Sequence, residues 1–129
     1  MTAQGVKQQL QFEAKTIQRY RERIERLRSG LEGGAGIDAE RVQGGAANSR
    51  LPDTISEIMR FEKEMQAVID RIQGNYLVLL DTPLQRKVIE HRYIHWMRWD
   101  KIALKMKYSE QHIYRLHWQA MRVICEKLS

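Results

Sequence analysis

The fold is decided by a stretch near the end of this 129-residue chain, Trp99-Asp-Lys-Ile-Ala-Leu-Lys-Met-Lys-Tyr-Ser-Glu-Gln-His-Ile-Tyr-Arg-Leu116. Apolar residues recur at helical spacing on both sides of Lys107-Tyr108. Ser109, followed at once by an acidic residue, is a typical helix N-cap. The stretch therefore predicts a short helix from residue 99 or 100 to 106, a turn, and a longer helix over 110–127.

The spacing inside this stretch favours a helix-turn-helix. The small side chain of Ala103 lets the second helix cross the first closely, and the apolar positions expected around it are filled by Ile102, Met106, Tyr108, Ile113 and Leu116. Two short helices joined by such a turn are typical of the motif. One position departs from it, because the turn residue that is often glycine is Lys107, which requires an unusual backbone or a slightly different turn.

A lead-in helix is predicted just before this pair. Thr82 can act as its N-cap and Pro83 suits its first position. We expect Leu84, Val88 and Ile89 to face inward, and in the last helix Ala120 together with Val123 or Ile124. Residues 81–129 are thus predicted to form one C-terminal module.

Two heptad-patterned helices are predicted upstream of the module. In residues 1–29 the apolar stripe is Val6, Leu10, Ile17, Tyr20, Ile24 and Leu27, with Glu13 as its one polar member. In residues 51–80, with Pro52 in the first turn, it is Ile55, Ile58, Glu62, Met65, Ile69, Ile72, Tyr76 and Leu79. Gly74-Asn75 predicts a kink, a break or an early stop. The glycine-rich residues 30–50 predict a flexible linker.

The fold class predicted is all-α, a long helical arm or hairpin followed by the C-terminal module. Each upstream helix carries a narrow apolar stripe and cannot be stable alone in water. The two helices must pack on one another, on the C-terminal module or on a second copy of the chain, and heptads alone do not choose among these.

Charge is concentrated in the last third of the chain. The net charge is +6, and residues 83–129 hold ten basic and four acidic side chains, whereas residues 51–82 hold three and six. All four histidines and all three tryptophans also lie in residues 83–129. Basic charge interleaved with aromatic side chains is typical of a nucleic-acid contact, although a solvated basic face is the commoner alternative.

The run from Trp99 to Arg122 resembles the region 4 helix-turn-helix of bacterial sigma factors, and Arg86-Lys-Val-Ile-Glu-His-Arg-Tyr-Ile94 resembles its lead-in helix. Small phage-encoded relatives, the ArpU-type and RinA-type transcription regulators, share the layout of helical arm and sigma-like module. Asp38-Ala-Glu-Arg-Val-Gln-Gly-Gly45 is similar to a stretch in phage proteins of this group. The close resemblance covers residues 83–126. It implies a DNA-binding regulator, with RNA polymerase as a candidate partner.

The resemblance implies that the start of the last helix reads bases in the major groove. The positions that match are Glu110, Gln111, Tyr114 and Arg115. The order of residue types departs from that of sigma factors, so groove geometry carries over and sequence preference does not. From chemistry alone, arginine pairs with guanine, glutamine with adenine, and glutamate accepts from cytosine. The residues expected to meet phosphates are Arg98, Lys101, Lys105, Lys107, Ser109 and Arg122.

Other functional classes find little support in the sequence. His91 and His95 lie four apart but lack a third ligand, so we expect no metal site. No catalytic constellation appears, so we predict a protein that is not an enzyme, with no cofactor and no small-molecule substrate. No apolar run suits a membrane helix or signal peptide, and the single Cys125 fits a reducing compartment. We therefore expect no membrane partner and a cytoplasmic location in a bacterial host.

Two functions from different classes stay open. The first is sequence-specific binding of double-stranded DNA by a phage or prophage transcription regulator, with the heptad arm mediating a homodimer or contact with RNA polymerase. The second is a packaging protein like a small terminase subunit, or a helix-turn-helix reused for protein interaction. Dependence of DNA affinity on salt discriminates between DNA binding and pure protein interaction.

Overall fold

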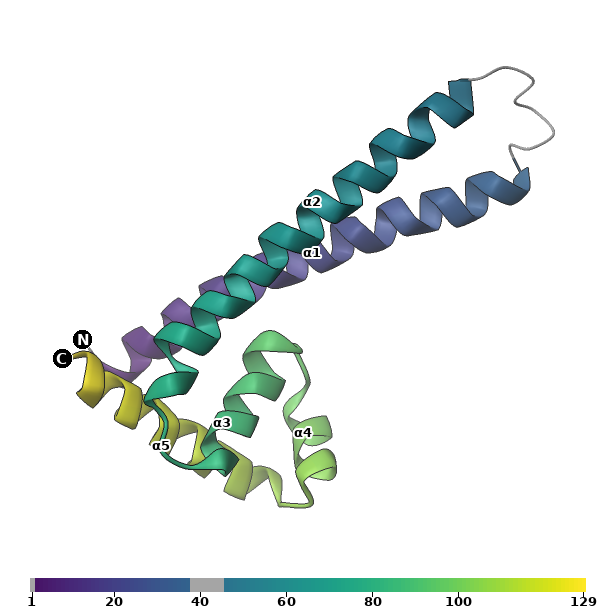
Figure 1. The fold of residues 1–129 in the computed structure, drawn as a ribbon. Coiled ribbons are helices and arrows are strands. Elements are labelled where there is room, and N and C mark those ends of the chain that lie inside the picture. The colour runs from purple at the N-terminus through teal and green to yellow at the C-terminus, as the bar shows by residue number, and fades with distance from the viewer. Residues whose placement is uncertain (1, 38–45) are drawn as a thin grey trace. The chain divides into compact units, whose positions relative to one another are not determined.

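The computed structural model describes residues 2–37 and 46–129, and all of its regular structure is helical (Figure 1). Within these ranges there is no strand, which confirms the all-α prediction. The elements in chain order are α1 (Ala3–Ile37), α2 (Ala46–Asn75), the 3-10 turn η1 (Leu77–Leu79), α3 (Pro83–Ile89), the π turn η2 (Glu90–Ile94), α4 (Trp99–Met106) and α5 (Glu110–Leu128).

The first two helices are longer than the sequence predicts. α1 passes residue 29 and α2 begins before residue 51, so both helices extend into the predicted linker, of which residues 38–45 lie outside the described residues. A Cβ placed on Gly30 would meet nothing within 4 Å. An exposed glycine of this kind weakens a helix by about 1 kcal/mol without ending it.

The observed start of α2 differs from the predicted start, whereas its observed end agrees with the prediction. Pro52 lies inside α2 and not in its first turn, so that assignment was wrong; the helix begins six residues earlier, at Ala46. α2 ends at Asn75, at the Gly74-Asn75 pair where the sequence predicts a break. The glycine's backbone entropy and the short polar asparagine side chain favour termination at this point.

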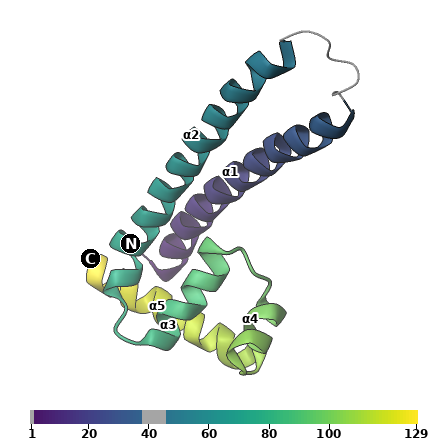
Figure 2. The ribbon, with the colours of Figure 1, turned by 45° about the vertical axis from the view of Figure 1, so that its right-hand side comes forward.

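The chain divides into two compact units. One comprises Met1–Ile17 and Val68–Ser129, and the other comprises Gln18–Ala67. Each unit contains a segment of α1 and a segment of α2, and both views show these two helices running side by side (Figures 1 and 2). The first unit is therefore discontinuous in sequence and contains the whole C-terminal module.

The second unit is a pair of antiparallel helix segments around a small core. Ile24 of α1 packs with Ile58 and Phe61 of α2, and Tyr20 and Met65 lie against them. The ring centroids of Tyr20 and Phe61 are 6.0 Å apart. This cluster settles the packing of these two segments, which cover one another.

The buried stripe of α2 is shifted from the predicted one. Phe61 and Val68 are buried, whereas Ile55 is 44% exposed. Glu62 lies beside the core and pairs with Arg28 at 3.0 Å. The large ring of Phe61 takes the core position because its burial gains more free energy than that of a carboxylate.

In the first unit the start of α1 is closely packed. Val6, Leu10, Ala14 and Ile17 are almost fully buried. Ala14 takes the core position next to Glu13, whose carboxylate accepts instead from the guanidinium of Arg71 at 3.2 Å. The polar member of the predicted stripe is thus replaced by its neighbour, as expected for a charge that can pair at the edge of a core.

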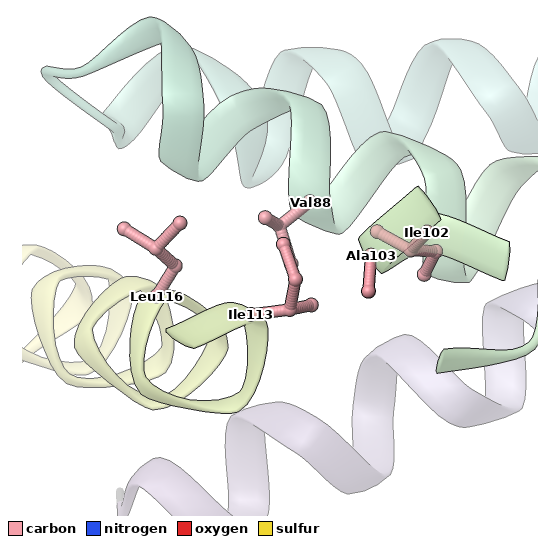
Figure 3. Close-up of a cluster of buried hydrophobic side chains, with 5 residues drawn as sticks. All are labelled: Val88, Ile102, Ala103, Ile113 and Leu116. Carbon is pink, nitrogen blue, oxygen red and sulfur yellow. The ribbon is translucent and has the colours of Figure 1, made fainter. Parts of the chain in front are cut away.

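The three helices of the C-terminal module share a core of five buried side chains (Figure 3). Figure 3 shows Val88 of α3 between residues of α4 and α5, and the full set is Val88, Ile102, Ala103, Ile113 and Leu116. The module's helix starts are those predicted. The backbone N–H of Gln85 donates to the Thr82 hydroxyl at 3.3 Å, and Pro83 occupies the first position of α3.

Several expected core positions differ. Leu84 is 38% exposed and Tyr108 is 40% exposed, so neither fills the core position predicted for it. The buried side chains of this lead-in helix lie in its last turn and in η2, which leaves the first turn at the surface. In α5 Ile124 is buried and Val123 is partly exposed, which decides the alternative between them.

None of the described helices combines the length and the apolar character that crossing a membrane requires.

Candidate nucleic-acid interface

The turn between α4 and α5 depends on one residue in the left-handed region. Lys107 has φ 62° and ψ 41°. The N–H of Tyr108 donates to the carbonyl of Ala103 at 3.1 Å, and the N–H of Lys107 donates to the carbonyl of Leu104 at 3.3 Å. These are the two hydrogen bonds of a Schellman motif. Of the two alternatives that the sequence left open for Lys107, the structure shows the unusual backbone.

α5 begins directly after this turn. Ser109 has an extended backbone, and its hydroxyl accepts from the N–H of His112 at 3.1 Å, as predicted for an N-cap. Glu110 lies in the first turn of α5, where a carboxylate interacts favourably with the helix dipole. Three residues, 107–109, thus separate α4 from α5 and fix where α5 starts.

The four candidate base readers lie together on the first two turns of α5. Glu110, Gln111, Tyr114 and Arg115 are all exposed. Their spacing of one, four and five residues places them on one side of the helix. The exposed face offers an amide, a guanidinium and a carboxylate, which are the groups that recognise base edges in the major groove.

A shallow hollow of about 420 Å³ lies at the base of this face. Its lining comprises Lys107, Tyr108, Ser109, Gln111, His112 and Arg115. Two of these side chains are cationic, and none is a carboxylate. The rings of Tyr108 and His112 lie against one another, with centroids 4.7 Å apart. Such a surface is suited to an anionic partner.

The remaining phosphate candidates are spread over α4 and the later part of α5. Lys101 and Lys105 are exposed one turn apart on α4, and Arg122 is exposed two turns after Arg115. Arg98 is the exception, because its guanidinium lies 3.4 Å from the carboxylate of Asp100, which partly neutralises it. None of these four side chains lines the hollow.

One base-reading candidate is supported from below by aromatic side chains. The ring of Tyr114 lies on the indole of Trp99, with centroids 4.7 Å apart. The indole also packs nearly perpendicular to the ring of His117, with centroids 5.0 Å apart, and the guanidinium of Arg92 lies 4.8 Å from the indole centroid. Arg92 itself donates to the carbonyl of Met97 at 2.9 Å. Trp99 is partly buried and also packs against the module core, and its contact with the exposed Tyr114 was not predicted from the sequence.

His117 is a buried polar residue that the sequence analysis did not single out. Its Nε2 is hydrogen-bonded to the Tyr93 hydroxyl at 2.6 Å. Burial, together with the charges of Lys7 and Arg92, lowers the pKa of His117 to about 4. Burial likewise raises the pKa of Tyr93. The burial of His117 could have been predicted from the sequence, since His117 lies four residues after the buried Ile113, on the same side of the helix.

His91 and His95 are the pair that the sequence suggested as half of a metal site, and no third ligand lies with them in the described residues. His91 and His95 have ring centroids 6.1 Å apart, and Nε2 of His95 lies 3.6 Å from the carboxylate of Glu90. Burial, and then the nearby Lys105, lowers the pKa of His91. Across residues 2–37 and 46–129 no group of three or more histidine, cysteine or acidic side chains is placed to hold a metal ion.

Cys125, the single cysteine, is half-buried on α5. Comparison of the chain with protein-family models, with curated proteins and with solved structures gives no match.

Proposed function

We propose that this chain binds double-stranded DNA sequence-specifically, with the start of α5 in the major groove and α4 lying across it. In this proposal α4, the Lys107 turn and α5 form a helix-turn-helix like that of sigma factor region 4. The observation that carries the proposal is the exposed α5 face of Gln111, Tyr114 and Arg115 directly beside the cationic hollow.

The proposed roles divide by chemistry. Arg115 pairs bidentately with guanine, Gln111 with adenine, and Glu110 accepts from cytosine N4. Lys101, Lys105, Lys107 and Arg122 contact phosphates and set affinity without reading sequence, while Ser109 supplies a hydroxyl at the helix start. Arg98 contributes less than the others, because Asp100 already lies beside it.

The first experiment selects preferred duplexes from a random pool and then measures Kd as salt is raised. Each phosphate contact contributes about 0.9 to the slope of log K against log salt, so four contacts predict a slope of about −4. A chain that binds no duplex even at low salt would contradict the proposal. A palindromic preferred site would indicate that two copies bind together.

The second experiment separates base reading from phosphate contact. Arg115→Ala is expected to cost about 1–3 kcal/mol on the preferred site and to lose discrimination at one base step. Lys105→Ala is expected to weaken binding equally on all duplexes and to reduce the salt slope by about 1. Lys63→Ala, an exposed lysine in the second unit, is the matched control and should leave both quantities unchanged.

We further propose that the DNA binding serves transcription regulation in a phage or prophage, in the bacterial cytoplasm. The support for this is the resemblance of residues 83–126 to sigma region 4. A homodimer through α1 and α2, and contact with RNA polymerase, belong to the same proposal. Analytical ultracentrifugation and co-purification with RNA polymerase test these two partners separately.

A second candidate function is protein interaction through the same motif. It is favoured by Leu104, which is 73% exposed on α4 between Lys101 and Lys105. A large apolar side chain on an otherwise basic helix face suits a protein surface better than a phosphate backbone. Leu104→Ser separates the two functions, since it should leave duplex affinity intact while abolishing binding to a protein partner.

A further inference from the structure

The contacts around Tyr114 differ from those of the other three candidate base readers. Its ring lies on Trp99 at a centroid distance of 4.7 Å and keeps 41% of its surface exposed. One part of the ring is therefore covered by the protein, and the rest is available to a ligand. No comparable aromatic support is found under Gln111 or Arg115 in the described residues.

Trp99 is itself held from several sides. The buried His117 ring packs nearly perpendicular to the indole, with centroids 5.0 Å apart, and the guanidinium of Arg92 lies over the indole, 4.8 Å from its centroid. Arg92 is fixed in turn by its hydrogen bond to the carbonyl of Met97. His117 is only 1% exposed and is hydrogen-bonded to Tyr93. The support of Tyr114 thus reaches into the core of the module through a continuous series of contacts.

We infer that Trp99 is a positioning residue for sequence recognition: its indole holds the Tyr114 ring in the orientation that meets one base step. The inference rests on the proposed DNA binding and adds to it a residue that does not touch DNA. A side chain held in its bound orientation loses less conformational entropy on binding, so a fixed tyrosine discriminates more sharply than a free one.

The expected size of the effect follows from this tilted contact between the two rings. An aromatic pair contributes about 0.5–1.5 kcal/mol beyond the area that it buries, which corresponds to a factor of roughly 2 to 13 in an equilibrium constant. We therefore expect Trp99→Leu to lower discrimination at the Tyr114 step by about 2- to 13-fold. Trp99→Phe keeps an aromatic ring under Tyr114 and should restore most of the discrimination.

The experiment measures Kd of the full chain for its selected duplex and for every single-base-pair variant of that duplex. Tyr114→Ala first identifies the base step that Tyr114 reads. Trp99→Leu should lose discrimination at the same step and little elsewhere, and the double variant should lose no more than Tyr114→Ala alone. Circular dichroism and urea unfolding establish that each variant is folded under the binding conditions.

A matched control is available on the same helix. Trp118 contacts His117 and Lys7, and in the described residues its ring does not pack against that of Tyr114, so Trp118→Leu should affect stability without changing base preference. If Trp99→Leu weakens all duplexes by one factor, or if it adds fully to Tyr114→Ala, Trp99 supports only the fold and the inference is wrong. Absence of any duplex binding by the unmodified chain would instead overturn the proposed function, and the inference with it.

Should Trp99→Leu not fold, the same Kd measurements on Trp99→Phe and Tyr114→Phe test the inference. Tyr114→Phe keeps the ring on the indole and removes only the hydroxyl. Fluorescence gives an independent readout, since DNA bound over Tyr114 should alter the emission of Trp99 in a chain whose Trp96 and Trp118 are replaced by phenylalanine. An emission that stays unchanged on saturation with the selected duplex counts against the inference.

Discussion

Lys107 permits a test in which backbone strain and charge are separated at a single position. Its φ of 62° lies in the left-handed region, which costs a residue with a side chain about 1–2 kcal/mol and glycine almost nothing. Glycine in turn loses more backbone entropy on folding, by roughly 0.5–1 kcal/mol. The balance predicts that Lys107→Gly is more stable than Lys107→Ala by about 1 kcal/mol.

Both substitutions remove the same positive charge, so they should weaken DNA binding equally. Each is expected to reduce the slope of log K against log salt by about 0.9, the contribution of one phosphate contact. The assays are urea unfolding for stability and salt-dependent Kd for binding. Equal stability of the glycine and alanine variants would refute the argument from backbone strain. Unequal loss of DNA affinity would show that the turn's conformation, and not only its charge, contributes to binding.

Three further predictions concern the stability of the module. Ser109→Ala removes the cap on the His112 N–H and should cost about 1 kcal/mol in urea unfolding. Ile113→Ala opens a cavity in the module core and should cost about 2–5 kcal/mol by the same measurement, with the exposed Gln111→Ala on the same helix for comparison. His117 has a folded pKa of about 4, below its ordinary 6.5, so the unfolded chain binds the proton more readily between these values. Stability is therefore full above pH 6.5 and is lost as pH falls toward 4, by about 2–3 kcal/mol relative to a His117→Gln variant that cannot titrate there.

The module's elements could be predicted because their signals are local. Thr82 and Ser109 cap helices through hydrogen bonds to residues three positions away, and Pro83 and Gly74 act on their own turns. Such effects involve residues only a few positions apart, so the sequence by itself contains the information needed to predict them. At Lys107 the sequence left an unusual backbone and a different turn open, and the structure shows the first of these, a left-handed residue.

Features that depend on contacts between residues far apart in sequence could not be predicted. Whether Phe61 or Glu62 enters the core is decided by Ile24 and Arg28 of the other helix, which are more than thirty residues away in sequence. The placement of Trp99 beneath Tyr114 likewise needs the crossing of α4 and α5. The pattern names the apolar residues of a helix, but the partner helix selects which of the neighbouring positions are buried.

The discontinuity of the first unit has a consequence for the order of folding during synthesis. Its opening segment, Met1–Ile17, leaves the ribosome long before the segment Val68–Ser129 that completes it. Domains generally fold as units once their residues are available. The contiguous Gln18–Ala67 can therefore form its helix pair while Val6 and Leu10 still lack their core partners. The candidate DNA-reading surface should become functional only when α5, which is made after α3 and α4, has been released.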